Sequence, residues 1–162
     1  MDAAKVLPDG SKTYMGFRGG TLGGFNESAT LPANPALIAA AEAAGERLTS
    51  ASALPIWPGV EARPVVHRGV VGSSDTWTQH RPSIETLHEE HGTMCEEMEA
   101  SSIAAVCASF GVPFLAVKDI SNNELRDDTT DSLLKVAEEI GKRAAMVVHA
   151  TIAAMAEPSP RL

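Results

Sequence analysis

The chain has 162 residues, of which 44% are hydrophobic, and this length and composition suit one soluble globular domain with its own core. Its 21 acidic and 13 basic residues give a formal net charge of -8 without a cluster of Lys and Arg, which argues against nucleic acid as a partner. The two cysteines, Cys95 and Cys107, lie too far apart for a C-x-x-C motif, so we expect no disulfide framework, no metal site and a reducing compartment.

We expect no export or membrane signal from the N-terminal residues. Residues 1–5 lack a basic start followed by an apolar run, and no stretch approaches the ~20 apolar residues that cross a bilayer. We therefore expect a cytoplasmic protein without membrane contact. Residues 2–35 are rich in Gly, Pro, Asn and Ser, which predicts loops with one short strand near residues 13–17. The Gly pairs within residues 19–24 lack a P-loop Lys, so turns are favoured over a phosphate loop.

Capping signals and hydrophobic periodicity predict helices that alternate with strands from residue 34 onward. Asn34 can cap a helix that begins at Pro35 and keeps helical spacing to Leu48. A β-branched run predicts a strand over residues 65–73, and a charged helix over residues 82–90 can stop at Gly92. This alternation predicts an α/β domain over residues 1–162 with a largely parallel sheet.

The second half of the chain continues the same alternation. An extended piece over residues 93–97 leads into a helix over residues 100–110, whose larger apolar side chains form one stripe. A buried strand over residues 113–117 follows. A long helix over residues 131–155, capped by Thr130 or Asp131, ends the pattern, and Arg143 lies on its solvated face.

Polar residues follow three of the predicted strands. They occupy residues 72–77, residues 97–99 and residues 119–122. In parallel sheets, ligands bind in a crevice beyond the carboxyl ends of the strands. We therefore expect the three clusters to meet on one rim and to form a ligand site.

Each prominent residue of these clusters has a functional and a purely structural interpretation. In the functional interpretation, the Glu99 carboxylate before a helix is stabilised by free backbone N–H groups and accepts hydrogen bonds from a vicinal diol. In the structural interpretation, Glu99 is a helix cap or a solvated acid. Trp77 can stack on a flat heterocycle or cover a core edge, and Met98 can lie under a sugar or simply pack. Asn122 suits a purine edge or begins a turn.

Three segments, in their order and spacing, resemble a known family. Gly72-Ser73-Ser74-Asp75-Thr76-Trp77, then residues 96–104, and then residues 111–115 running into Ile120-Ser121-Asn122 resemble 5′-methylthioadenosine/S-adenosylhomocysteine nucleosidases, within the nucleoside phosphorylase family. The resemblance implies the C-terminal portion of a three-layer α/β/α sandwich with a mixed, largely parallel sheet. It implies a hydrolase of nucleoside metabolism that acts in methionine salvage and cleaves the N-glycosidic bond of methylthioadenosine-type purine nucleosides.

The resemblance also assigns roles around the base and the sugar. Trp77 matches the aromatic side chain that lies against the purine, and Thr78 matches the neighbour whose backbone meets the base edge. Met98 and Glu99 match the ribose-contacting pair, in which the carboxylate takes the 2′- and 3′-hydroxyls. Glu97 belongs to the same substrate-binding segment.

The chain departs from the family at the leaving group. Ser121 and Asn122 match the pair at the purine N7 side, where a nucleosidase of this family usually has an Asp that protonates the base. An amide cannot deliver a proton, so Asn122, the catalytic candidate, would assist only by hydrogen bonding. An Asn here resembles enzymes that act on 6-oxopurines, such as futalosine hydrolases and trimeric purine nucleoside phosphorylases.

The second departure from the family is length. The segments that resemble the family correspond only to its C-terminal part. The acid that activates water belongs to the family's N-terminal half, so we nominate no residue for that role. Three functions stay open: a nucleosidase, a 6-oxopurine relative working by hydrolysis or phosphorolysis, and a non-catalytic nucleoside-binding or assembly module. We expect no cofactor. Because a half-sheet exposes edge strands, we expect a homo-oligomer or a partner that supplies the other half.

Overall fold

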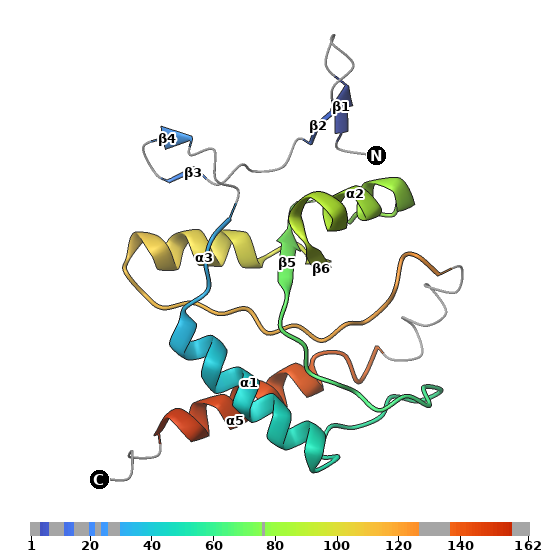
Figure 1. The fold of residues 1–162 in the computed structure, drawn as a ribbon, viewed down its shortest axis with the longest axis vertical. Coiled ribbons are helices and arrows are strands. Elements are labelled where there is room, and N and C mark those ends of the chain that lie inside the picture. Colours follow the sequence, from blue (N-terminus) through green and yellow to red (C-terminus); the bar gives the residue numbers. More distant parts are fainter. Residues whose placement is uncertain are drawn as a thin grey trace. The chain divides into compact units, whose positions relative to one another are not determined.

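The computed structural model describes residues 30–75, 77–126 and 137–156 with their side chains, and the backbone of four short strands before them (Figure 1). These strands form two antiparallel pairs where the sequence predicted loops and one strand: β1 (Ala4–Val6) with β2 (Lys12–Tyr14), and β3 (Gly20–Thr21) with β4 (Gly24–Phe25). The chain divides into two compact units, Met1–Pro32 with Gly69–Phe114, and Ala33–Arg68 with Leu115–Leu162. A single domain over residues 1–162 stays a prediction.

The first unit contains a strand–helix–strand crossover. Strands β5 (Val70–Ser73) and β6 (Thr93–Glu97) are parallel, and α2 (Arg81–His91) connects them (Figure 1). Gly92, at φ +67°, ends α2 in the left-handed conformation, and its N–H donates to the His88 carbonyl, which confirms the predicted stop. The crossover agrees with the predicted α/β class, because parallel neighbours need such a connection.

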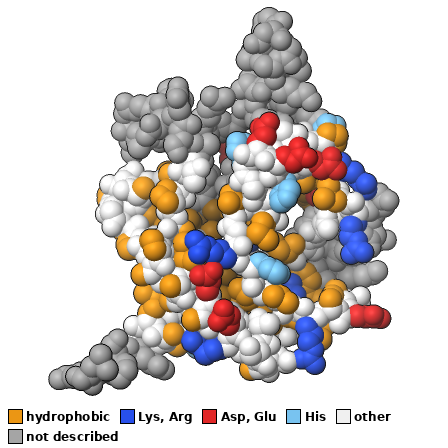
Figure 2. Space-filling model, viewed as in Figure 1, with side chains coloured by type: hydrophobic (Ala, Val, Ile, Leu, Met, Phe, Trp, Pro, Cys, Tyr) orange, Lys and Arg blue, Asp and Glu red, His pale blue; other side chains and the backbone are white. Residues whose placement is uncertain are grey.

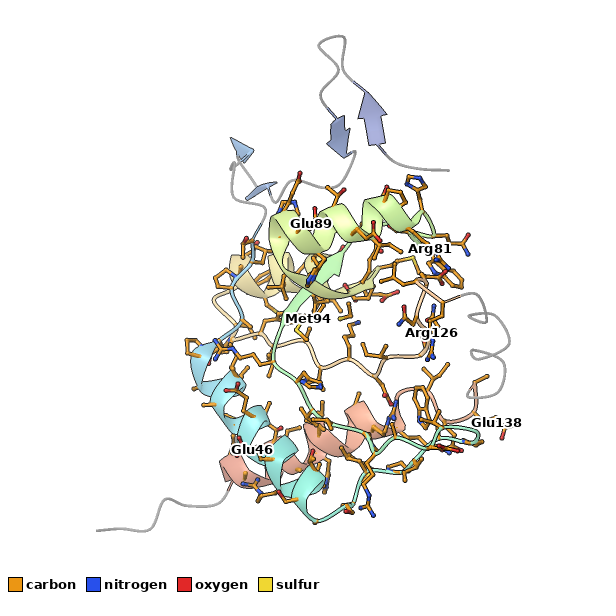
Figure 3. All side chains as sticks on the ribbon, turned by 45° about the vertical axis from the view of Figure 1, so that its right-hand side comes forward. Glu46, Arg81, Glu89, Met94, Arg126 and Glu138 are labelled. Carbon is orange, nitrogen blue, oxygen red and sulfur yellow. The ribbon has the colours of Figure 1, made fainter. Side chains whose placement is uncertain are left out.

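Strand β5 is shorter than predicted. The predicted strand began at residue 65, whereas β5 begins at Val70. The difference has a packing cause, because the side chain of Val66 lies against helix α1 (Pro35–Ser50) in the second unit. A Cβ built on Gly45 of α1 would come within 2.7 Å of Val66 Cγ1. At the start of β5, Met94 of β6 packs closely over Gly69, where only glycine leaves room for it (Figure 3).

Helix α3 (Ala100–Ser109) follows β6, and its burial differs from the prediction. Its buried residues are Ala100 and Ala104, whereas Ile103, Val106 and Phe110 of the predicted stripe are exposed. The buried face of the helix is therefore made of small side chains, and its larger apolar side chains lie at the surface. Figure 2 shows many apolar side chains at the surface of the viewed face.

The second unit is built on two packed helices. Helix α1 and helix α5 (Lys142–Ala156) lie against each other (Figure 1). The predicted cap is confirmed, because Asn34 Oδ1 accepts hydrogen bonds from the backbone N–H groups of Ala36 (3.0 Å) and Leu37 (3.2 Å). The unit's core residues are small, aromatic and branched: Ala41, Ala44, Leu54, Trp57 and Val147.

Two further predictions about the second half of the chain are corrected. Residues 113–117, predicted as a buried strand, pair with no strand in the described part of the chain, and Phe114 and Leu115 are only half-buried. An apolar run becomes a strand only when a neighbouring strand accepts its backbone hydrogen bonds. The C-terminal helix begins at Lys142, because residues 137–141 form turns that end in Gly141 at φ +86°. The predicted caps at residues 130 and 131 lie outside the described residues.

A search of the described residues for membrane-crossing helices found none with the required length and apolar character.

Candidate functional site

The carboxyl ends of β5 and β6 lie next to each other. Ser73 is the register partner of Glu97, and the Ser74 N–H donates to the Glu97 carbonyl at 3.0 Å. This pairing brings two of the three predicted polar clusters, residues 72–77 and 97–99, to one edge of the sheet. The third cluster, residues 119–122, belongs to the second unit and is described separately.

Glu97 and Ser73 satisfy the first N–H groups of helix α3. Both carboxylate oxygens of Glu97 lie 2.9 Å from the Ala100 nitrogen, and one accepts from the Glu99 N–H at 3.1 Å. Ser73 Oγ accepts from the Ser101 N–H at 3.0 Å and lies 3.1 Å from Ser101 Oγ. An acid at this position suits the positive end of the helix dipole.

This arrangement contradicts one interpretation of Glu99, that its side chain caps helix α3. Glu99 occupies the N-cap position with φ −121° and ψ −32°, and its side chain makes no capping hydrogen bond. Favoured N-cap side chains are short, with an oxygen close to the helix N–H groups, whereas a Glu two residues earlier can reach forward to them. Glu97 therefore takes the helix N–H groups, and the Glu99 side chain is exposed at the same edge.

The two proposed apolar contacts of the site are also exposed. Trp77 has 52% of its surface exposed, and Met98 has 46%. Neither residue is buried in the core of the first unit, about half of each side chain is covered, and both interpretations of each residue stay predictions. Both side chains are accessible to a ligand.

A carboxylate that the sequence did not single out connects the loop of Trp77 to β6. Glu96 Oε1 accepts a hydrogen bond from Thr78 Oγ1 at 2.5 Å and another from Ser74 Oγ at 3.3 Å. Glu96 is the register partner of Gly72 on β5. Only this pairing reveals the contact, because Glu96 lies about twenty residues from the loop along the chain.

In the second unit, hydrogen bonds hold Asn122 by both ends of its amide. Ser121 Oγ donates to Asn122 Oδ1 at 2.5 Å, and Asn122 Nδ2 donates to Glu124 Oε1 at 2.8 Å. Ser121, Asn122 and Glu124 are half-buried. An amide NH₂ carries two donors, of which Glu124 takes one. The neighbouring carboxylate therefore fixes which way the amide points.

Asp119, three residues before Asn122, forms a largely buried ion pair with Arg143. Arg143 Nε and Nη2 donate to Asp119 Oδ1 at 2.8 and 2.6 Å, and the Arg143 N–H donates to Oδ2 at 3.3 Å. The Asp119 side chain is 6% exposed and that of Arg143 is 16% exposed. The Arg143 guanidinium also stacks over Trp57, 3.6 Å from the ring centroid.

This pair corrects the prediction that Arg143 is solvated. Helical periodicity alone places Arg143 with the polar residues, but the carboxylate of Asp119 and the ring of Trp57 draw it into the unit. The pair ties the segment that precedes Ser121 to the first turn of α5. Among the described residues, no group of three or more His, Cys, Asp or Glu side chains could hold a metal ion.

Comparison with known proteins gives two nucleosidases and a hydrolase among the relatives of this chain. The chain is 26% identical over 118 residues to a 5′-methylthioadenosine/S-adenosylhomocysteine nucleosidase of Mycobacterium bovis, which covers 73% of this chain and 46% of the relative. It is 34% identical over 122 residues to a futalosine hydrolase of Streptomyces coelicolor, covering 75% of this chain and 43% of the relative.

The chain thus spans about half the length of the curated relatives it matches. A shorter match, 36% identical over 63 residues, is to an aminodeoxyfutalosine nucleosidase of Helicobacter pylori and covers 39% of this chain and 27% of the relative. No solved structure matched the chain significantly. The family model of the Phosphorylase superfamily matches residues 4–153, and the chain therefore belongs to that superfamily.

Proposed function

We propose that this chain carries the base- and ribose-binding part of a purine nucleosidase that hydrolyses the N-glycosidic bond of 5′-methylthioadenosine/S-adenosylhomocysteine-type nucleosides. The observation that carries the proposal is the shared strand edge of β5 and β6. The register of these strands brings the segment of Met98 and Glu99 next to the loop of Trp77 and Thr78. Similarity to nucleosidases supports the reaction class.

In this proposal the Glu99 carboxylate binds the ribose. Cleavage of a glycosidic bond passes through a transition state in which positive charge develops on the sugar. A carboxylate that accepts hydrogen bonds from the 2′- and 3′-hydroxyls orients the ring and stabilises that charge. Because Glu97 already accepts the helix N–H groups, Glu99 is the acid of this segment that we assign to the sugar.

The base is held by the other groups. The Trp77 ring stacks on the purine, and the backbone of Thr78 meets the base edge. Asn122 donates its amide hydrogen to the departing purine and stabilises the negative charge that forms there. The Glu124 carboxylate, 2.8 Å from Asn122 Nδ2, keeps the donor end of the amide in one orientation.

A 6-oxopurine substrate is the second candidate, and Asn122 is the observation that favours it. A 6-oxopurine presents two acceptors, N7 and O6, to a donor, whereas adenine presents an acceptor and a donor at the same edge. An amide donor fits the first edge. The similarity to a futalosine hydrolase points the same way.

Product analysis separates these candidates. Purified protein is incubated with methylthioadenosine, adenosylhomocysteine, inosine and futalosine, with and without phosphate. Free adenine without phosphate supports the main proposal, and free hypoxanthine supports the second candidate. Ribose 1-phosphate that forms only with phosphate indicates phosphorolysis. Release of no base from any of the four overturns the hydrolase proposal and leaves a nucleoside-binding module, which calorimetry detects as binding without turnover.

The role of Glu99 has its own test. Glu99→Ala is expected to weaken nucleoside binding by roughly 10- to 100-fold, because hydrogen bonds to a charged group contribute about 1.5–3 kcal/mol. Binding of the free base should change much less, since the base lacks the ribose hydroxyls. Glu46→Ala is the matched control, because Glu46 is an exposed acid on α1 in the other unit (Figure 3). Equal losses for nucleoside and base would contradict the ribose assignment.

We also propose that a second copy or a partner chain extends the sheet. In the described part of the chain β5 and β6 form a sheet of two strands, whereas sheets commonly have about five or six. Sedimentation velocity at micromolar concentration is expected to show a dimer or a larger assembly. A sharp monomer with full nucleosidase activity would refute this expectation.

A further inference from the structure

We propose that Glu96 is a positioning residue that holds the loop of Trp77 against strand β6 through the hydroxyl of Thr78. The inference rests on the proposed function for the ligand that Trp77 meets, but the contact itself is a property of the free protein. Glu96 is not one of the residues assigned to base, sugar or leaving group.

The strand separates the two neighbouring acids. Along β6, burial alternates, with Thr93, Cys95 and Glu97 half-buried and Met94 and Glu96 exposed. Successive side chains of a strand point to opposite faces. Glu97 uses its face to hold the N-terminus of α3. Glu96 is therefore directed away from α3.

On its own face, Glu96 meets the loop that follows β5. A single oxygen, Oε1, accepts from Thr78 Oγ1 at 2.5 Å and from Ser74 Oγ at 3.3 Å. These two hydroxyls flank Trp77, one three residues before it and the other one residue after it. A hydroxyl-to-carboxylate hydrogen bond of about 2.5–2.7 Å is roughly twice as strong as a neutral one. The Thr78 contact is therefore the stronger of the two tethers.

The tether matters because burial does not hold Trp77. With 52% of its surface exposed, the Trp77 ring is not fixed by burial in the core, so a contact that fixes the backbone of its loop contributes to where the ring lies. A loop fixed before ligand arrives loses less conformational entropy on binding. Glu96 thus acts on the base through Thr78 and Trp77 and touches no part of the substrate.

Tryptophan fluorescence of the full chain can measure the motion of Trp77. Trp57 is buried at 6% exposure, so acrylamide quenching and fast anisotropy decay report mainly on Trp77, and Trp77→Phe supplies the remaining Trp57 signal. Thr78→Val removes the donor and keeps the shape, whereas Glu96→Gln keeps the size and removes the charge. Both are expected to raise the quenching and the fast-decay amplitude of Trp77. Thr78→Ser should restore the wild-type values.

Two further variants test the specificity of the contact. The double variant Thr78→Val/Glu96→Gln is expected to show no more loop motion than Glu96→Gln, because Glu96→Gln already weakens the contact that Thr78→Val removes. Glu89→Ala removes an exposed acid from α2 of the same unit and should leave Trp77 unchanged (Figure 3). Circular dichroism establishes that each variant is folded. Unchanged Trp77 motion in both folded single variants overturns the proposal.

Ligand binding separates this inference from the proposed function. With adenine and hypoxanthine as probes, Thr78→Val and Glu96→Gln are each expected to raise Kd by roughly tenfold, the lower end of the range that loss of one charge-assisted hydrogen bond implies. If the wild-type chain binds neither base while Trp77 is still released in the variants, the tether is supported and the proposed base-binding role of Trp77 is overturned. If the bases bind equally well to all variants, the positioning role is overturned.

Discussion

Removal of the Asp119 carboxylate is expected to destabilise the second unit strongly. In Asp119→Ala, the Arg143 guanidinium loses an acceptor that takes hydrogen bonds at 2.6 and 2.8 Å, and its side chain is only 16% exposed to water. What remains beside the cation is the face of Trp57. The substitution therefore leaves a charge that is neither well hydrated nor paired.

The expected loss follows from that burial. Removing one partner of a buried ion pair costs about 3–5 kcal/mol, whereas an exposed pair contributes about 0–1 kcal/mol. Arg143→Ala should cost about as much, because Asp119 is 6% exposed and the stacking on Trp57, worth about 1–2 kcal/mol, is lost as well. The double variant should cost less than the sum of the two single variants by about 2–3 kcal/mol, since neither charge is then left alone.

Urea unfolding followed by tryptophan fluorescence and circular dichroism measures these losses. Lys142→Ala is the matched control, because Lys142 precedes Arg143 on the same helix and makes a more exposed pair with Glu139 at 2.9 Å. It should change the free energy of unfolding by less than about 1 kcal/mol. If Asp119→Ala costs no more than Lys142→Ala, the buried pair does not hold the second unit together and the reasoning fails.

Three further substitutions test local features by the same unfolding measurement. Asn34→Ala should cost about 1 kcal/mol through loss of the α1 cap, and Asn34→Asp should retain most of it. Gly45→Ala should destabilise the chain by about 1–2 kcal/mol although alanine has the better helix propensity, because the new Cβ would lie 2.7 Å from Val66 Cγ1. Adding Val66→Ala to this variant should relieve the clash. A net gain in stability for Gly45→Ala alone would disprove the close approach. Glu97→Ala should cost about 1–2 kcal/mol and speed hydrogen exchange of the Ala100 amide, which an unchanged exchange rate would contradict.

Local signals in the sequence predicted much of the fold. The Asn34 cap, the stop at Gly92 and the strand over residues 93–97 lie where the sequence placed them, because each depends on side chains within a few residues of the backbone that they control. The order of the rim segments likewise pointed to the superfamily whose model matches the chain. Such features need no knowledge of distant partners.

Part of the candidate site also followed from the sequence. The prediction that the segments of Trp77 and Glu99 lie at one sheet edge holds because parallel strands end on the same side. The roles assigned to Trp77, Thr78, Met98, Glu99 and Asn122 stay predictions, and the experiments proposed above test those of Trp77 and Glu99.

Only the tertiary structure decided which of several equivalent polar residues makes which contact. The sequence by itself determined that acids cluster at residues 96–99, but strand direction and register assigned Glu97 to helix α3 and Glu96 to the loop of Trp77. Helical periodicity predicted that Arg143 is solvated, whereas in the structure it is largely buried because it pairs with Asp119, 24 residues away in the sequence. The physical reason is the same in both cases: a charged side chain takes the position of its best partner, and that partner is supplied by a part of the chain that no local pattern records.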